Sequence, residues 1–490
     1  MKYLLVKVVN IHLNGSIYDV IIIGAGMGGL GAGIYLQTKN SNLKTVILEQ
    51  HTQPGGYVTG FKRKGFYFDG GAEGIMGMDD SGSLRLALGE LGFEHKFLRE
   101  DPLEHYYYED KEFSLYTTRE ALLKEIEIQY PDQKEGFERF LKRCKSIIQE
   151  QQNGKPVPEQ NKPYIEFIKE FVTSEDIIDA FNLFCLWFGA TPSETPAIHI
   201  AHIIIGVLEE GVFYPKGGMQ AFSDHLADFY VQKGGKIVYK SMVRKIIMNK
   251  GRTVGVKLLD GITFEGKFII SNADVKKTIL QYVGKQYFPE EYWQSIDELR
   301  QSVTGIMLFL GVDVDLSKYP SHFQIGCDLN VVEKVNNNEF TLDKLAIRIP
   351  SNIDPSLKSQ KGDSLLAFIF QPYNWENYWR AGPNLVRGDE YNSYKEELTD
   401  KLITKIESVI PRLREHIIVK ELATPLTFER YVQVTDGAWF GPFSFQELPS
   451  FKTPIDNLFL VGSSIKGSGV PSALRSGLEV GKYLLEKHLS

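Results

Sequence analysis

The sequence predicts an α/β fold in which a parallel-sheet domain is built from separated stretches of the chain and alternates with a second domain. Two observations lead to this prediction. Near the N-terminus a strand, a glycine-rich turn, a helix and a second strand follow one another, which is the order of a parallel βαβ unit. Near the C-terminus another strand, glycine-rich loop and helix follow, from Leu458 to about Leu485. Because the two parts lie far apart in the chain, we expect the domain to be discontinuous.

The N-terminal unit begins with an expected strand at Tyr18–Ile23, an apolar run bounded by polar residues and glycine. A GxGxxG turn, a helix pattern, a strand at 44–48 and an acidic residue follow. Glycines at this spacing let backbone amides approach a pyrophosphate at the helix N-terminus, and the acid can accept hydrogen bonds from ribose hydroxyls. An ordinary βαβ crossover is the alternative. The pattern predicts a dinucleotide site at Gly24, Gly26, Gly28, Gly29 and Glu49.

A second glycine pair, Gly55 and Gly56, follows shortly after Glu49 and would bring another backbone segment against the same cofactor. Simple NAD enzymes have no need of such a segment, whereas an extended flavin cofactor is held along its length by several. The pair therefore points to FAD. Because no second GxGxxG occurs, we expect the electron partner to be an organic substrate, with oxygen, a quinone or another acceptor in the other half-reaction.

The composition excludes several other classes of protein. The 490 residues are 43% hydrophobic and 24% charged, as in globular proteins. A formal net charge of −7 argues against a nucleic-acid partner. Cys144, Cys185 and Cys327 form no CxxC, which excludes a disulfide scaffold and a cysteine-ligated metal or cluster. His199 and His202 share a helix face without clear further ligands, so we predict no metal site.

The compartment is predicted from the apolar segments. Residues 1–9 are apolar, but Lys7 interrupts them and no cleavage signal follows, so we expect no signal peptide. No segment reaches the roughly 18 uncharged apolar residues of a transmembrane helix. We therefore expect a cytoplasmic protein. The apolar stretch Phe181–Leu208 adds the expectation of a peripheral contact with a membrane.

The C-terminal unit combines an expected strand at Leu458–Val461, a loop at Gly462–Gly469 and a helix with Pro471 in its first turn, where proline is well placed. Between the two units the pattern predicts a helix that starts near Met219 and ends before Gly234. A β-meander is expected to follow, with strands at 236–239, 254–259 and 263–270.

Five segments occur in order along nearly the whole chain: ILEQHTQPGG, GFYFDGG, YPKGGMQAFSDHL, IISNAD and LVGSSIKGSGVPSALRSG. Together they resemble the phytoene desaturase group of FAD-dependent oxidoreductases, which includes carotenoid cis–trans isomerases and retinol saturases. The resemblance implies a discontinuous, GR2-type Rossmann-like FAD-binding domain, interleaved with a substrate domain of mixed sheet and helices that faces a membrane. We expect 1–100, 214–285 and 424–490 in the first domain, and 101–213 and 286–423 in the second.

The resemblance also implies roles for residues outside the N-terminal unit. Val243 would contact the adenine edge through its backbone, and a buried strand valine is compatible with that role. The helix N-terminus at Gly469 and Val470 would face the pyrimidine edge of the flavin, where its dipole favours the reduced form. Gly462 and Ser463 would complete the cofactor residues. Many relatives carry an acid or a glycine-rich variant where this chain has Ser463 and Ser464, which leaves the ribityl contact open.

Aromatic residues are abundant, with 24 Tyr, 30 Phe and 5 Trp. Core packing is the default interpretation of each one, but together they predict an apolar tunnel for a long substrate with few polar groups. The expected clusters are Phe181, Phe184, Trp187 and Phe188; Tyr106, Tyr107 and Tyr108; Tyr373, Trp375, Tyr378 and Trp379; and Trp439, Phe440, Phe443 and Phe445.

Two ionisable residues are candidates for proton handling in catalysis. Glu73 follows the Asp69-Gly70-Gly71 block, and Lys466 lies in the loop before the C-terminal helix. A solvated loop charge is the alternative for each. Arg475, in the first turns of that helix, could serve the cofactor or a surface pair.

The function expected from these features is FAD-dependent desaturation of an isoprenoid or carotenoid-type lipid. A hydride would pass to flavin N5, and aromatic faces would stabilise the cation left on the chain. Polyene saturation and carotenoid cis–trans isomerisation are the alternatives on the same scaffold. Alternatives of other classes are a non-catalytic isoprenoid-binding escort protein and a flavin amine oxidase.

Overall fold

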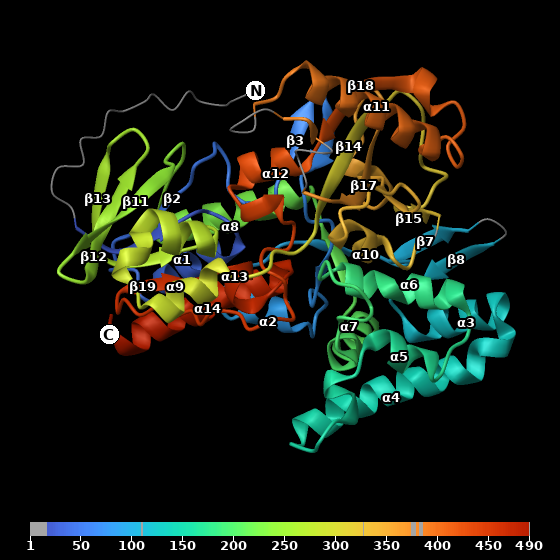
Figure 1. Ribbon diagram of the computed structural model, residues 1–490, viewed down its shortest axis with the longest axis horizontal. Coiled ribbons are helices and arrows are strands. Elements are labelled where there is room, and N and C mark those ends of the chain that lie inside the picture. The colour runs from blue at the N-terminus through green and yellow to red at the C-terminus, as the bar shows by residue number, and fades with distance from the viewer. Residues whose placement is uncertain (1–16, 109–110, 327, 374–378, 382–385, 490) are drawn as a thin grey trace.

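In the computed structural model the chain gathers around two seven-stranded sheets and a group of helices, with a two-stranded and a three-stranded sheet beside them (Figure 1). The structure describes residues 17–108, 111–326, 328–373, 379–381 and 386–489. The segment 1–9, and Trp375 and Tyr378 of one aromatic cluster, lie outside these ranges. The arrangement confirms the predicted α/β class.

The first sheet has a parallel core in the order β10, β2, β1, β13, β19. Its strands are β10 Lys236–Val238, β2 Thr45–Leu48, β1 Tyr18–Ile23, β13 Thr263–Ser271 and β19 Leu458–Leu460. Every residue of β2 is buried, as expected for a parallel strand covered on both faces. Because these strands run the same way, their carboxyl ends meet at one edge, where ligands bind in open α/β sheets.

The expectation that 236–239 opens a β-meander is wrong. This segment forms β10, which pairs in parallel with β2. The meander consists of β11 Val243–Asn249, β12 Arg252–Leu258 and the first part of β13. A register shift between Val243 and Lys245 interrupts the alternation of β11, and this irregularity hides the strand in the sequence.

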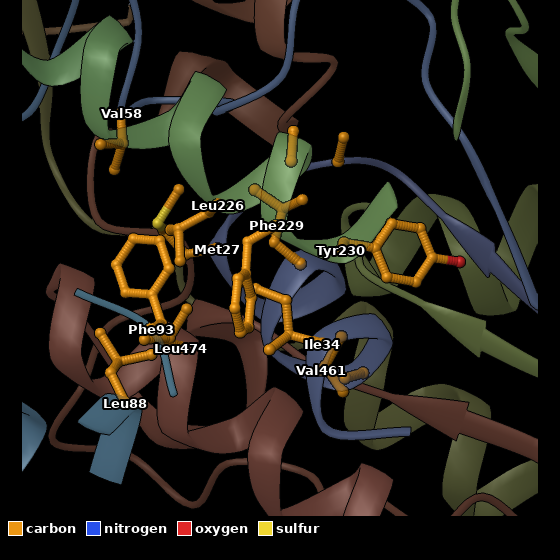
Figure 2. Packing of buried hydrophobic residues seen from close by; sticks show 14 of the residues in the cluster. Met27, Ile34, Val58, Leu88, Phe93, Leu226, Phe229, Tyr230, Val461 and Leu474 are labelled. Atoms are coloured by element: carbon orange, nitrogen blue, oxygen red, sulfur yellow. The ribbon is translucent and has the colours of Figure 1, made fainter. Parts of the chain in front are cut away.

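Helices cover one face of the first sheet and the meander covers the other. The helices are α1 Met27–Lys39, α2 Ser83–Gly89, α8 Met219–Gln232 and α14 Val470–Lys487. Figure 2 shows Ile34, Leu226 and Leu474 from three of these helices in one apolar cluster. On the other face lie the meander, a π-helical turn at Lys277–Gly284 and α9 Glu290–Asp297.

The second sheet runs in the order β18, β14, β17, β16, β15, β7, β8. Its β15–β7 pair is parallel and its other pairs are antiparallel. The strands are β7 Glu104–Tyr107, β8 Glu112–Leu115, β14 Thr304–Val312, β15 His322–Ile325, β16 Leu345–Arg348, β17 Asp363–Gln371 and β18 Ile417–Ala423. α11 Asp389–Ile406 covers one face of this sheet through Leu398, Leu402 and Ile406. The predicted mixed sheet is therefore confirmed.

A lobe of helices lies beside β7 and β8 (Figure 1). It contains α3 Arg119–Gln129, α4 Lys134–Gln152, α5 Tyr164–Lys169, α6 Glu175–Leu186 and α7 Ala197–Glu210. Most apolar side chains of the stretch 181–208 are buried in the core of this lobe, where they face other helices. The stretch therefore gives no support to a membrane-facing surface. Among the described residues, no helix combines the length and the low polarity that a bilayer crossing demands.

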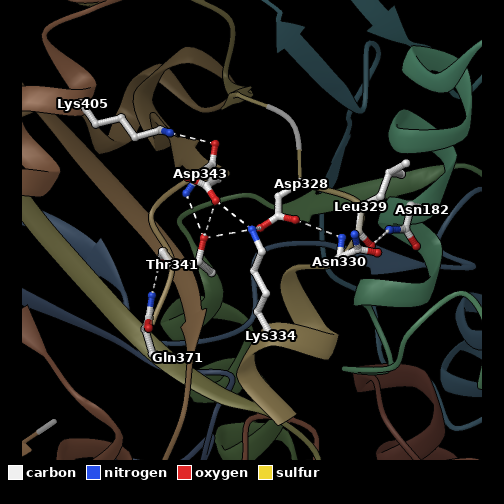
Figure 3. Close-up of polar contacts among 9 residues, drawn as sticks. All are labelled: Asn182, Asp328, Leu329, Asn330, Lys334, Thr341, Asp343, Gln371 and Lys405. Atoms are coloured by element: carbon white, nitrogen blue, oxygen red, sulfur yellow. Dashed lines mark hydrogen bonds and ion pairs between the residues drawn. The ribbon is translucent and has the colours of Figure 1, made fainter. Parts of the chain in front are cut away.

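Short elements complete the fold: β3 Gly60–Arg63, β4 Phe66–Asp69, β5 Ile75–Met76, β6 Phe97–Arg99, β9 Val212–Pro215, α10 Val331–Asn336, α12 Pro425–Val432 and α13 Ser463–Lys466. A polar cluster holds α10 beside the second sheet (Figure 3). Lys334 Nζ donates to Asp328 Oδ2 at 3.0 Å and to Asp343 Oδ2 at 2.8 Å.

The segment 462–469, which was expected to be a loop, contains one helical turn, α13.

Candidate active site

The carboxyl ends of β1, β2, β13 and β19 open onto a cavity of about 590 Å³. Its wall continues from this edge of the parallel sheet onto one face of the second sheet, through Met307, Phe368, Ala346, Arg348, His322 and Gln324. The cavity therefore joins the two sheets, so that a cofactor bound at one end would meet a substrate bound at the other.

Glycine and Asn272 shape the turn after β1. Gly24 has a φ of +91°, in the left-handed region that favours glycine. A Cβ on Gly26 would lie 2.6 Å from Asn272 Nδ2, and one on Gly28 would lie 2.5 Å from Asn272 Oδ1. Asn272 directly follows β13, and its backbone amide donates to the carbonyl oxygen of Ile23 at 2.9 Å. Side chains are thus excluded at these glycines, and the backbone of the turn stays open to the cavity.

Glu49 follows β2 and is buried on the cavity wall. The backbone amide of Ala25 donates to its Oε2 at 2.7 Å, and that of His51 donates to its Oε1 at 2.9 Å. These two bonds fix the orientation of the carboxylate. Its remaining lone pairs can accept hydrogen bonds from ligand hydroxyls.

Two further glycine segments border the same turn. Gly55 and Gly56 have φ values of +124° and +62°, and the Gly55 amide donates to the carbonyl oxygen of Ala25 at 2.9 Å. Gly462, with a φ of +94°, donates its amide to Ser476 Oγ at 2.7 Å. The N-termini of α1 and α14 both line the cavity, where their free amides favour negative charge.

The cavity wall includes the predicted cofactor residues Gly24, Gly26, Gly28, Glu49, Gly55, Gly56, Val243, Gly462, Ser463, Gly469 and Val470. Gly29 lies off the wall. A Cβ on Gly29 would lie 2.1 Å from the carbonyl oxygen of Gly24, so this glycine allows the turn to close. These features fit FAD, because an extended dinucleotide needs an open turn, a fixed carboxylate and several close backbone segments. The individual roles stay predictions.

Glu73 lies on the cavity wall and faces His322, with Oε2 and Nε2 3.6 Å apart. Glu104 lies on the other side of the imidazole, with its Oε2 3.4 Å from Nδ1. Burial raises the pKa of Glu73 to about 8, against the attraction of Arg348. Burial also raises the pKa of Glu104 and lowers the pKa of His322. Burial therefore favours the neutral form of all three groups.

Lys466 lies apart from this group. Its Nζ pairs with Glu479 Oε2 at 2.9 Å, and its side chain is 43% exposed. The contacts of Lys466 are thus those of a solvated surface pair, and we withdraw it as a candidate for proton handling. Arg475 lines the cavity and donates a hydrogen bond to Ser83 Oγ.

Two buried ion pairs border the wall beside Glu73. Arg348 Nη1 donates to Glu100 Oε2 at 2.5 Å, and Lys344 Nζ donates to Asp179 Oδ1 at 2.8 Å. The guanidinium of Arg348 lies 5.0 Å from the ring centroid of Tyr214. Arg348, Glu100 and Lys344 all line the cavity, so its wall is charged at this place.

The predicted aromatic clusters are divided between the cavity and the cores. The residues on the wall are Trp187, Phe188, Trp439 and Phe440, joined by Phe368 and Phe370 of β17. Phe181, Phe184, Tyr106 and Trp379 are buried in the cores. Part of the predicted aromatic residues therefore line the cavity, the four core residues named here pack away from it, and the substrate tunnel stays a prediction.

Several wall residues escaped prediction because no motif marks them. His322 and Arg348 come from the short strands β15 and β16 and meet only because these residues are opposite in the ladder. Asn272 could have been found, since it follows β13 in the segment IISNAD and carboxyl ends of parallel strands share one edge.

Comparison with known proteins adds to this geometry. The chain is 28% identical to prolycopene isomerase 1, chloroplastic, of an Oncidium hybrid cultivar, over 94% of this chain and 82% of that one. It is 25% identical to 4,4'-diapophytoene desaturase (4,4'-diapolycopene-forming) of Methylomonas sp, over 96% and 95%. A solved oxidoreductase of Methanosarcina mazei shares the fold, with a TM-score of 0.69 and 18% identity over 95% of this chain and 100% of that one.

The names of these relatives fall in the group that the sequence motifs resemble. The family described as flavin containing amine oxidoreductase matches residues 27–485. Because this match spans nearly the whole chain, the protein belongs to the flavin containing amine oxidoreductase family and is an FAD-dependent oxidoreductase.

Proposed function

We propose that this enzyme acts on carbon–carbon bonds of an isoprenoid or carotenoid-type lipid, with desaturation as its reaction. The glycine turn after β1 and Glu49 form the predicted dinucleotide site, called here the cradle. The observation that carries the proposal is that one cavity continues from this cradle to an aromatic wall that includes Trp187, Phe188, Trp439 and Phe440. A long apolar ligand offers few hydrogen bonds, so its affinity comes from buried area, at about 25 cal/mol per Å². The names of the relatives support the same class of lipid.

Bound FAD would supply a hydride acceptor for an allylic C–H bond. The chain itself would contribute the surroundings of this chemistry. Aromatic faces such as Trp439 would stabilise positive charge on the polyene, and the buried wall would exclude water. The deprotonated form of Glu73 would take up the proton that desaturation releases; with a pKa of about 8 this form is the minor one near pH 7 and the major one at higher pH.

Saturation of a polyene and cis–trans isomerisation are the alternatives on the same scaffold, because the cavity suits either direction. One relative is named an isomerase and another a desaturase. An amine oxidase is less well supported, because neither of these two relatives is named as one. A non-catalytic escort protein would have no use for the cofactor cradle.

The electron acceptor, the membrane contact and the domain boundaries are further parts of the proposal. Oxygen, a quinone or another acceptor would reoxidise the enzyme. A membrane surface would deliver the substrate, because isoprenoid lipids partition into bilayers. The segments 1–100, 214–285 and 424–490 would form the FAD-binding domain. Flotation with liposomes tests the membrane contact, and a protein that stays wholly in the soluble fraction would argue against it.

The central experiment is an anaerobic titration of the FAD-loaded protein with a polyene. Bleaching of the flavin absorbance, together with a new double bond detected by mass spectrometry, is expected for desaturation. Dithionite-reduced protein that regains its flavin colour on adding a polyene would favour saturation instead. Hydrogen peroxide release with polyamines and no response to any polyene would contradict the proposal.

A further inference from the structure

We propose that Arg348, Glu100, His322 and Glu73, called here the polar wall, bind a terminal hydroxyl group of the substrate. The substrate would then be a long apolar chain that carries one hydroxyl end. This inference rests on the proposed function and narrows its substrate class.

The polar wall contains buried polar atoms that have no hydrogen-bond partner among the described residues. These atoms are Arg348 Nε and Nη2, Glu100 Oε1, His322 Nε2 and Glu73 Oε1. The side chains of Arg348 and Glu100 are only 2% and 1% exposed. Polar groups buried in this way cost free energy unless a ligand or an ordered water completes them. Since the four residues line the cavity, a ligand in the cavity can do so.

The strand pairing explains how the polar wall faces the cavity. His322 is opposite Arg348 between β15 and β16, and Ala346 is opposite Phe368 between β16 and β17. Directly opposite residues point to the same face of a sheet. Along this face the wall changes from Phe368 and Met307, which are apolar, to Arg348 and His322. An apolar chain that lies across these strands would therefore meet polar groups at one end.

The charges of the wall select a neutral group. Arg348 is paired with Glu100, and Lys344 is paired with Asp179. A carboxylate end would be attracted to Arg348 but repelled by Glu100, and an ammonium end would be attracted to Glu100 but repelled by Arg348. A hydroxyl both donates and accepts, so it can accept from the free nitrogens of Arg348 and donate to Glu100 Oε1 or Glu73 Oε1.

The test measures binding separately from turnover. Trp187 and Trp439 line the cavity, so a bound polyene should quench tryptophan fluorescence. The FAD-loaded full chain is titrated with three polyenes of one chain length: a hydrocarbon, its terminal alcohol and its terminal carboxylic acid. We expect the alcohol to bind about tenfold tighter than the hydrocarbon or better, because its partners are charged. Equal affinities for the alcohol and the hydrocarbon, or an acid that binds tighter than the alcohol, would overturn the inference.

Two variants locate the effect. Arg348→Lys keeps the charge but loses the free nitrogens, and His322→Phe keeps a planar ring without its nitrogens. Each should lower the preference for alcohol over hydrocarbon to below about threefold and leave hydrocarbon binding unchanged. Arg143→Lys is the matched control, because Arg143 also pairs with glutamates, Glu150 and Glu159, but lies off the cavity wall. If Arg348→Lys does not retain FAD, the inference is judged from His322→Phe and from the wild-type ratio of alcohol affinity to hydrocarbon affinity.

Variants that weaken both ligands equally would contradict the inference, since the polar wall would then shape the cavity without selecting a hydroxyl. Failure of the proposed function has a different signature. In that case none of the three polyenes quenches the fluorescence, whereas a hydrocarbon that binds as well as the alcohol leaves the proposed function standing.

Discussion

Glu73 and His322 face each other with 3.6 Å between Oε2 and Nε2, a separation beyond hydrogen-bond length. The contact joins the segment after β4 to the first residue of β15 in the second sheet. Burial favours the neutral form of each group, which avoids the desolvation cost of an ion pair in this position. Proton uptake or loss at Glu73 therefore changes both the stability of the fold and the polarity of the cavity.

Glu73→Gln should reduce the pH dependence of stability. The pKa of Glu73 is raised from 4.5 to about 8 in the folded protein, so its contribution is complete below pH 4.5 and is lost as the pH rises through 8. We expect the wild type to lose on the order of 3 kcal/mol of unfolding free energy from this group between pH 5 and 8. Urea unfolding at both pH values measures the difference, and equal losses in wild type and variant would refute the assignment.

Gly28→Ala should abolish retention of FAD. Its Cβ would lie 2.5 Å from Asn272 Oδ1 and 2.7 Å from the backbone nitrogen of Gly462, so the turn or its neighbours must move. A destabilisation of about 1–3 kcal/mol is expected from this overpacking. Gly89→Ala is the control, because no atom lies within 4 Å of the added Cβ. Flavin absorbance per protein after desalting reports the result, and a Gly28→Ala protein with full flavin content would count against the cradle.

Glu49→Gln should weaken FAD binding by about 10- to 100-fold, because it removes a charged acceptor that is held in place by the amides of Ala25 and His51. Titration of the apoprotein with FAD, followed by flavin fluorescence, gives the affinity. Glu94→Gln, at an exposed position, serves as the control. An affinity within twofold of the wild type would exclude Glu49 from the ribose contact.

Lys466→Ala should leave turnover unchanged within about twofold and alter stability by less than about 1 kcal/mol, as for other exposed ion pairs. Its partner Glu479 is 51% exposed, so the carboxylate stays in contact with water when Lys466 is removed. Steady-state kinetics and thermal unfolding check this expectation. A large fall in turnover with normal flavin content would restore Lys466 as a catalytic candidate.

Prediction from the sequence succeeded where the residues that line the cavity also form a local motif. The run at Tyr18–Ile23 became β1 with the expected bounds, and the glycines after it line the cavity because their spacing reflects the turn itself. β11 was missed because a register shift at Val243 breaks its alternation. The polar wall was also out of reach. Arg348 and Glu100 are distant in the sequence, and only strand pairing across both sheets brings their charges together.

Helices from opposite ends of the chain complete the cradle, and their contact is tight: a Cβ on Gly477 of α14 would lie 2.0 Å from the carbonyl oxygen of Gly28 in α1. During translation the glycine turn leaves the ribosome long before Gly462 and Val470 exist. The complete glycine-lined site therefore exists only after α14 has been synthesised, and until then the part of α1 that packs against α14 stays uncovered. We therefore expect FAD to bind late in biosynthesis, and we expect a chain that stops short of residue 470 to be a substrate for chaperones and proteases.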